Sequence, residues 1–183
     1  MYIIEFFKYL FSKNKAITKE ESLSKENNER FTFFYHGPFC QWYTSPFVLD
    51  GISYNCAEQY MMAEKARLFG DHQIMARILK ANDPYDQKEL GKKVKNFDQK
   101  TWDKNKYNIV KRGNLAKFEQ NPELLLDLAK TQGTTLVEAS PFDQIWGIGL
   151  SETDTEAKKR ETWRGENLLG QILTEVRKEL IGE

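Results

Sequence analysis

The chain has 183 residues, of which 40% are hydrophobic, and this length usually forms one domain with a real core. Lys and Arg balance Asp and Glu at 27 each, so the whole chain has no broad electrostatic attraction for nucleic acid or an anionic membrane. The two cysteines and two histidines form no ligand cluster, which argues against a disulfide scaffold or a zinc site. We expect a cytoplasmic protein without a bound metal.

The first thirty residues differ in composition from the rest. Apolar side chains recur at helical spacing within residues 1–13, and an almost entirely polar stretch follows up to Arg30. The apolar run lacks a preceding basic region and is too short to span a bilayer. Residues 1–30 are therefore predicted to form an amphipathic helix and a polar linker. The helix would rest on the domain or a partner, and a weak contact with a membrane surface is the alternative.

Residues 31–183 are predicted to form one mainly α domain with a small antiparallel β component, an α+β fold. Asp50-Gly51 lies between two short apolar runs and is typical of a two-residue type I′ hairpin. Further strands are expected at 31–35 and 134–138. Helices are expected from Asn55, over 71–81, after Asp83-Pro84, over 98–119, after Asn121-Pro122, and from about Asn167 to the end. There is no internal repeat, transmembrane run or βαβ alternation.

The most informative segment is residues 52–66. Asn55 followed by Glu58 is typical of a helix start with a capping box. In that helix Glu58 and Lys65 lie on the same face, together with methionines at 61 and 62 and an aromatic residue at 69. The two charges are separated by about 10 Å along the axis, at about 1.5 Å per residue. They are too distant for an ordinary ion pair, and close enough to bracket a small polar ligand.

Several familiar catalytic motifs are absent from the sequence. It has no phosphate-binding loop, no GxGxxG, no GxSxG and no HExxH. Carboxylates, a lysine and tryptophans remain as the groups that could carry chemistry. This set suits a reaction at an anomeric carbon, where a carboxylate stabilises positive charge or activates water and aromatic rings stack on a leaving base.

An ordered set of motifs resembles the NADAR superfamily, including its YbiA-like members. No single motif is decisive, but the set covers residues 31 to 181 in order, and residues 1–30 fall outside it. The motifs are Phe33-Phe34-Tyr35, Gln41-Trp42-Tyr43, Asp50-Gly51, Tyr54 to Met62 with Lys65-Ala66, Thr101-Trp102, Leu115 to Phe118, Asn121 to Leu124, Leu136-Val137-Glu138, Asp143 to Gly149, and Trp163 to Gly170.

The resemblance implies a compact, mainly helical N-glycosidase that needs no metal or organic cofactor. The implied substrates are a phosphorylated ribosylamino-pyrimidine of riboflavin biosynthesis or an ADP-ribosylated guanine, which could be part of a nucleic acid. In each, ribose C1 is bonded to an exocyclic amine. The implied catalytic residues are Glu58 and Asp143, with Lys65 as a candidate nucleophile. The implied substrate-binding residues are Trp102, Trp146, Gly147, Lys117 and Asn167.

Each of these residues also has a structural interpretation. Glu58 could only cap a helix, Lys65 could be a surface lysine, the tryptophans could be core residues, and Asp143 could stabilise a turn. Basic residues expected to contact phosphate could instead form an ordinary solvated face; they are Lys111, Arg112, Lys117 and Arg164. The rival functions are a non-catalytic ADP-ribose or nucleotide sensor, and a partner-binding module recruited through residues 1–13.

Overall fold

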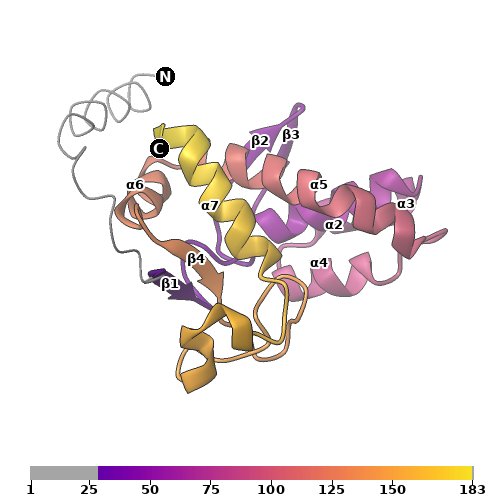
Figure 1. The fold of residues 1–183 in the computed structure, drawn as a ribbon. Helices are drawn as coiled ribbons and strands as arrows, with labels where there is room; N and C mark the ends of the chain where they lie inside the picture. Colours follow the sequence, from indigo (N-terminus) through magenta and orange to yellow (C-terminus); the bar gives the residue numbers. More distant parts are fainter. Residues whose placement is uncertain (1–28, 183) are drawn as a thin grey trace. The chain divides into compact units, whose positions relative to one another are not determined.

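The computed structural model describes residues 29–182, so the predicted N-terminal helix and nearly all of its linker lie outside the described residues. The described residues form two compact units (Figure 1). His36–Asn121 is called the middle unit, and residues 29–35 together with 122–182 are called the split unit. Helices dominate and strands are few and short, which confirms the predicted mainly α class with a small β component.

The middle unit begins with a β hairpin and continues with helices. Strand β2 (Phe47–Leu49) pairs antiparallel with β3 (Ile52–Tyr54), and Leu49 lies opposite Ile52. Asp50 and Gly51 connect them with φ angles of 53° and 76°, which confirms the predicted hairpin turn. Helix α2 packs against each of the other three helices (Figure 1), which are α3, α4 and α5. The bounds are Ala57–Leu68 for α2, His72–Lys80 for α3, Pro84–Gly91 for α4 and Gln99–Gln120 for α5.

Three of these helices begin where local sequence signals predict. The carboxylate of Asp71 accepts from the backbone N–H of Ile74, and that of Asp98 accepts from Thr101. Asp83 caps α4, and Pro84 occupies its first turn.

Helix α2 differs from the prediction, because its N-cap is Cys56 and no side chain caps it. The predicted capping box of Asn55 and Glu58 is therefore wrong. The Asn55 side chain instead donates to the carbonyl of Asn82 and accepts from Gln87, while its backbone N–H donates to Gln59. The backbone N–H of Asn55 is thus bonded to Gln59 rather than to Glu58.

Helices α2 and α5 pack closely and run antiparallel. Lys65 lies near Trp102, whereas Tyr60, nearer the start of α2, contacts Gly113, nearer the end of α5. A Cβ atom at Gly113 would lie 2.3 Å from Tyr60 Cδ1, so only glycine permits this approach. Gly113 has a low helix propensity, but the packing of α5 against Tyr60 requires it.

The split unit contains a parallel pair of strands. Strand β1 (Phe31–Phe34) pairs with β4 (Thr135–Glu138), with Phe31 opposite Thr135. This parallel pair accompanies the antiparallel hairpin that the sequence predicts. Helix α7 (Leu168–Ile181) packs on β4, and α6 (Pro122–Lys130) contacts α7 (Figure 1). The predicted apolar stripe of α7 is buried: Leu169, Ile172, Leu173, Val176 and Leu180.

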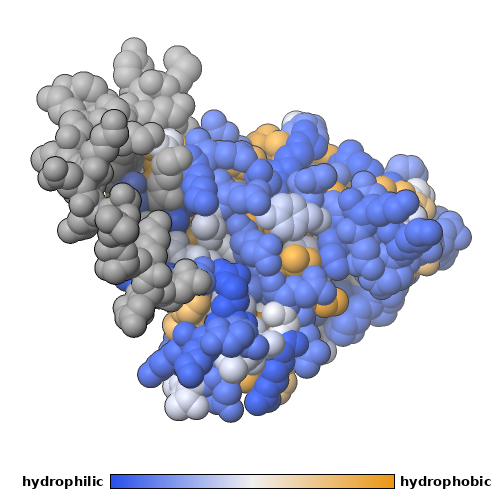
Figure 2. Space-filling model, viewed as in Figure 1, coloured by the Kyte–Doolittle hydropathy of each residue, from blue (hydrophilic) through white to orange (hydrophobic). Residues whose placement is uncertain are grey.

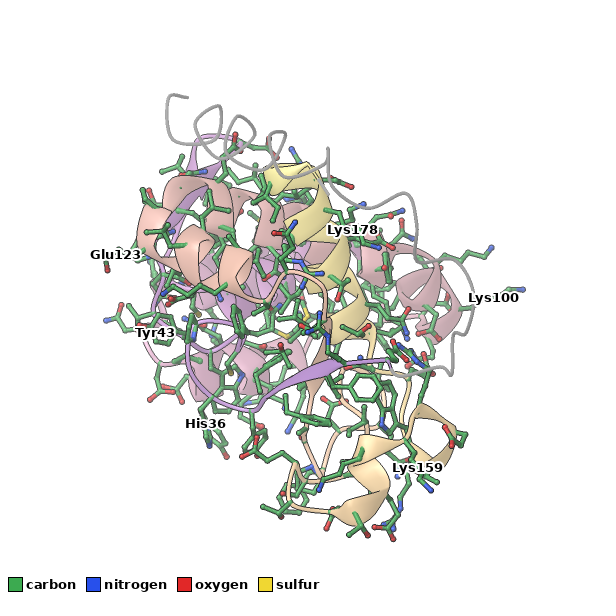
Figure 3. The ribbon with its side chains drawn as sticks, turned by 60° about the vertical axis from the view of Figure 1, so that its left-hand side comes forward. His36, Tyr43, Lys100, Glu123, Lys159 and Lys178 are labelled. Carbon is green, nitrogen blue, oxygen red and sulfur yellow. The ribbon has the colours of Figure 1, made fainter. Side chains whose placement is uncertain are left out.

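The space-filling view and the side-chain view agree with the polar composition. The face shown in Figure 2 is mostly hydrophilic, and hydrophobic atoms appear there in small separate areas. Figure 3 shows Lys100 of α5 and Glu123 of α6 directed outward from their helices, as expected for exposed charges. Within residues 29–182, no helix is both long and apolar enough to cross a membrane.

Candidate functional site

Glu58 is a buried carboxylate in the first turn of α2. The residue is only 3% exposed, and its backbone N–H donates to the carbonyl oxygen of Gln41 at 3.0 Å. The positive end of the helix dipole favours an anion at this place. Burying a carboxylate costs free energy, and buried carboxylates are therefore concentrated at functional sites. Glu58 is therefore the leading candidate for a catalytic carboxylate.

Lys65 follows two turns later and is half-buried. Its Nζ lies 4.4 Å from the ring centroid of Phe97 and 5.8 Å from that of Trp102, both within the range of cation–π attraction. Burial lowers the pKa of the Lys65 amine, and the negative charge of Glu58 partly opposes this by raising it. The amine therefore has two aromatic neighbours, and the negative charge of Glu58 also acts on it.

Trp102 is 8% exposed and belongs to the first turns of α5. It lies four residues after the N-cap Asp98, while Phe97 directly precedes that cap. These are the two positions of a hydrophobic staple at a helix start. Trp102 thus combines a core location with proximity to Lys65. Phe97 is an additional candidate because its ring lies next to Lys65, and its position before a capped helix is the sequence signal that could have identified it.

Lys117 is fully buried on α5. Its Nζ donates to the carbonyl oxygen of Cys40 at 3.0 Å, and burial lowers the pKa of this amine to about 8. Trp102 lies fifteen residues earlier on the same helix, a separation of about 22 Å. A single ribose monophosphate cannot contact both side chains. These contacts favour a structural function for Lys117, and its predicted substrate contact remains a prediction.

Gln41 and Asn114 form a buried amide pair, and neither residue is among the predicted site residues. Asn114 Nδ2 donates to Gln41 Oε1 at 3.0 Å and to the carbonyl of Val110 at 2.9 Å. These two bonds fix the orientation of both amides. Gln41 Nε2 and Asn114 Oδ1 then have no hydrogen-bond partner among the described residues. An unmade buried hydrogen bond costs about 1–3 kcal/mol, so this pair has unused hydrogen-bonding capacity beside the start of α2.

Asp143 organises a loop of the split unit. Its Oδ1 accepts from the backbone N–H groups of Ile145 at 2.9 Å and Trp146 at 2.8 Å. Its carbonyl oxygen accepts from Gly149 at 3.1 Å. The turn function that the sequence analysis left open is therefore present. A catalytic function for the same carboxylate remains a prediction.

Trp146 and Gly147 lie in this loop and connect it to α7. The carbonyl oxygen of Trp146 accepts from Leu169, and that of Gly147 accepts from Asn167, each at 3.1 Å. A Cβ atom at Gly147 would lie 2.9 Å from the carbonyl oxygen of Glu138. Close packing within the loop thus requires glycine here. The Trp146 side chain is half-buried, so part of its surface is accessible.

The side chain of Asn167 connects the start of α7 to strand β4 by two hydrogen bonds. Its Oδ1 accepts from the backbone N–H of Glu138 at 2.9 Å, and its Nδ2 donates to the carbonyl oxygen of Leu136 at 3.0 Å. The residue is buried and its backbone is left-handed, with φ 54°. These contacts assign Asn167 a structural function, and its predicted substrate contact stays a prediction.

The predicted site residues therefore belong to two groups. The middle unit brings Lys65 near Trp102 and within the field of Glu58. The split unit holds Asp143, Trp146, Gly147 and Asn167 around one loop.

Of the predicted phosphate contacts, Arg112 instead forms an ion pair of 2.7 Å with Asp50. Across residues 29–182, no group of three or more His, Cys, Asp or Glu side chains could hold a metal ion.

Comparison with known proteins identifies the family. The NADAR domain matches residues 27–181, which include both units, and the chain belongs to this family. A mimivirus protein named N-glycosidase, from Acanthamoeba polyphaga mimivirus, is 42% identical and covers 80% of this chain and 94% of that protein. The Caenorhabditis elegans protein irg-1 is 36% identical and covers 86% of this chain and 83% of that protein.

A solved structure gives the same result for the fold. The NMR structure of the E. coli protein YbiA aligns with a TM-score of 0.68 and 26% sequence identity. The alignment covers 85% of this chain and 89% of YbiA. The resemblance to YbiA-like NADAR proteins that the sequence motifs indicate is therefore confirmed.

Proposed function

We propose that this protein is an N-glycosidase that hydrolyses the bond between ribose C1 and an amine on a heterocyclic base. The enzyme class follows from family membership and from 42% identity to a relative with that name. The observation that carries the proposal is the pairing of a buried carboxylate, Glu58, with a half-buried amine, Lys65, on one face of α2. The proposed substrates are a phosphorylated ribosylamino-pyrimidine of riboflavin biosynthesis and an ADP-ribosylated guanine.

Glu58 is proposed to act on the positive charge that develops at ribose C1. Cleavage of an N-glycosidic bond passes through an oxocarbenium-like state, which a nearby carboxylate stabilises. The location of Glu58 at a helix N-terminus supports the ionised form that this function needs. The same carboxylate could accept a proton from the attacking water. Asp143 is proposed as its partner for water activation or protonation of the leaving amine.

Lys65 is proposed as the nucleophile. The lowered pKa increases the fraction of neutral amine available to attack C1. Attack forms a bond from Lys65 Nζ to C1 and breaks the bond from C1 to the base; Nζ gives up one proton, and the leaving amine takes up one proton, with Asp143 as the proposed carrier. Opening of the sugar ring then gives a protonated imine, and water releases the ribose and the free lysine. Electrostatic retention of the substrate is the alternative function of Lys65.

The remaining residues are proposed to bind the substrate. Trp102 and Trp146 would hold the base or the ribose, since stacking on an aromatic ring is worth about 1–3 kcal/mol per base. The backbone at Gly147 would approach the ligand closely, and Asn167 would support that loop. Lys111 and Arg164 are the candidates for phosphate contact in either substrate. Lys117, about 22 Å from Trp102 along α5, would contact a phosphate only of the larger ADP-ribose conjugate. Because the chain has no net charge, a nucleic-acid substrate would be recognised through the modified base.

Turnover is the direct test of this function. The protein is incubated separately with a ribosylamino-pyrimidine phosphate, with ADP-ribosylated guanosine and with the unphosphorylated nucleoside, and free base is measured by chromatography. Release of base that depends on Glu58 would support the enzyme. Tight binding of ADP-ribose without release would favour the alternative, a non-catalytic sensor. Equal kcat/KM for phosphorylated and unphosphorylated substrates would contradict a phosphate-binding site.

The N-terminal segment needs a separate test. We propose that residues 1–13 contact a partner or a membrane surface, and that the enzyme acts in the cytoplasm. Deletion of residues 1–13 should then leave kcat/KM unchanged and change the location of the protein in fractionated cells. Unchanged fractionation would contradict this function of the segment.

A further inference from the structure

Phe97 is an exposed aromatic residue next to the candidate nucleophile. It is 40% exposed, although large aromatic side chains are usually buried, and its ring faces the amine of Lys65. We propose that Phe97 and Trp102 form an aromatic cage that holds the amine of Lys65 and stabilises its positive charge. Phe97 is thus a positioning residue; the cage concerns the amine itself, and only its contribution to catalysis rests on the proposed function of Lys65.

The distances fit a cage of two rings. The Nζ of Lys65 lies 4.4 Å from the Phe97 centroid and 5.8 Å from the Trp102 centroid, and cation–π attraction acts within about 6 Å. Phe69, one helical turn after Lys65, contacts Phe97 edge-on, with ring centroids 5.2 Å apart. The Phe97 ring is therefore supported on one side by Phe69 while it contacts the amine.

The backbone around Phe97 is fixed at both ends. Before it, the N–H of Lys95 donates to the carboxylate of Asp71 at 3.0 Å, and after it Asp98 caps α5. Between these anchors Asn96 has a left-handed backbone with φ 55°, a conformation that Asn adopts more readily than other residues except glycine. Phe97 is thus presented to Lys65 by a constrained segment rather than by a loose loop.

A cage would suit the proposed reaction. Lys65 carries a positive charge when it is protonated before the reaction, and during the reaction positive charge develops at the sugar carbon and on the protonated imine. The face of an aromatic ring attracts each of these cations. The negative charge of Glu58, on the same helix, raises the pKa of the Lys65 amine and so also favours its charged form. The two rings could therefore support this charge together with Glu58.

The rings have two opposing effects on Lys65. They exclude water, which favours the neutral amine, and their faces attract the ammonium, which favours the charged one. Replacing Phe97 with a small residue would remove both effects, so its result would be ambiguous. Adding fluorine atoms to the ring weakens only the attraction of the face and keeps nearly the same shape. Fluorinated phenylalanine at position 97 therefore isolates the cage.

The test measures the titration of Lys65 in the full chain without substrate. Phenylalanine carrying one, two or three fluorines is incorporated at position 97. Acylation of Lys65 by trace acetic anhydride is then followed against pH by mass spectrometry. The cage predicts a stepwise rise in the acid dissociation constant of Lys65, about two- to fivefold in total. The same fluorinated residue at Phe118, which lies over Lys117 instead, should leave the Lys65 titration unchanged.

An unchanged Lys65 titration across the fluorine series would overturn the cage and leave Phe97 as a staple of α5. Because acylation needs no substrate, this result is independent of whether the protein has glycosidase activity. Absence of turnover together with a shifted titration would reject the proposed function and retain the cage. In an active protein, Phe97→Leu should lower kcat more than it raises KM and Phe97→Tyr should restore it. Equal effects of both variants would count against the cage.

Discussion

The amine of Lys117 donates a hydrogen bond of 3.0 Å to the carbonyl oxygen of Cys40, and the lysine is fully buried on α5. Cys40 directly precedes Gln41, whose carbonyl oxygen receives the backbone N–H of Glu58. Lys117 therefore supports the segment that contacts the start of α2. Because the amine is buried, keeping it protonated in the folded protein lowers the free energy of unfolding.

Stability should rise between pH 8 and pH 10 because of Lys117. Its pKa falls from 10.5 to about 8 in the folded protein, so between these values the unfolded chain binds more protons. The penalty for burying the charge is constant below pH 8 and disappears as the pH rises. At 1.36 kcal/mol per pKa unit, the gain over this window is roughly 2–3 kcal/mol. Urea unfolding at pH 7.5, 9 and 10 measures it.

The matched control for this prediction is Lys117→Met, which removes the amine and keeps an unbranched side chain. Its free energy of unfolding should lack the rise between pH 8 and pH 10. Subtracting the two curves of unfolding free energy against pH cancels the contributions of other titrating groups. One of these groups is Tyr60, whose pKa is raised by burial. A parallel rise in both proteins would show that the Lys117 amine is accessible to water.

Glu58→Gln should reduce turnover by about 10²–10⁴-fold, the usual range for a positioned proton-transfer group. The variant keeps the shape of the side chain and removes its charge. Stopped assays of base release give kcat, and thermal unfolding shows whether the fold is intact. Glu64→Gln is the matched control, since Glu64 pairs instead with Arg67 on the same helix. Loss of activity explained wholly by unfolding would leave Glu58 without a catalytic function.

Asp143 requires two variants, because its Oδ1 stabilises a turn. Asp143→Asn retains an oxygen acceptor for that turn, whereas Asp143→Ala removes it. If the carboxylate takes part in chemistry, the Asn variant should lose activity while its melting temperature stays near that of the original protein. The Ala variant should lose both. A fully active Asn variant would assign Asp143 to the turn alone. With Glu58→Gln, the double variant should be less than additive.

Borohydride added during turnover should trap an adduct between the sugar and Lys65. An imine between the lysine and the opened ribose is reduced to a stable amine, which peptide mass spectrometry would locate. Lys65→Arg keeps the positive charge but cannot form this imine. That variant should therefore be inactive and give no adduct. Near-native turnover of Lys65→Arg would show that the lysine acts only through its charge.

The parts of the fold that follow local rules could be predicted from sequence. Asp50-Gly51 specifies the hairpin, and Asp71, Asp83 and Asp98 mark three helix starts, because each signal acts within a few residues. The start of α2 was mispredicted because Asn55 bonds to a loop 27 positions away. Tertiary contacts of this kind override a local capping signal.

The site could be predicted only in part for the same reason. Glu58 and Lys65 belong to one helix, so their spacing is visible in the sequence. Gln41 and Asn114 meet across 73 positions, and no periodicity connects them. Likewise, the turn at Asn96 that presents Phe97 depends on the capped start of α5 and on Asp71. These residues become visible only when the backbone is in place.

The division of the split unit between two parts of the chain has a consequence during synthesis. The hydroxyls of Thr32 and Thr134 bond across 102 positions, and the entire middle unit is translated between them. Domains generally fold as units while the ribosome advances, so His36–Asn121 can acquire structure while β1 still has no partner strand. An unpaired, phenylalanine-rich strand is a site of aggregation. Residues 31–34 therefore stay without their partner strand until β4 has been synthesised.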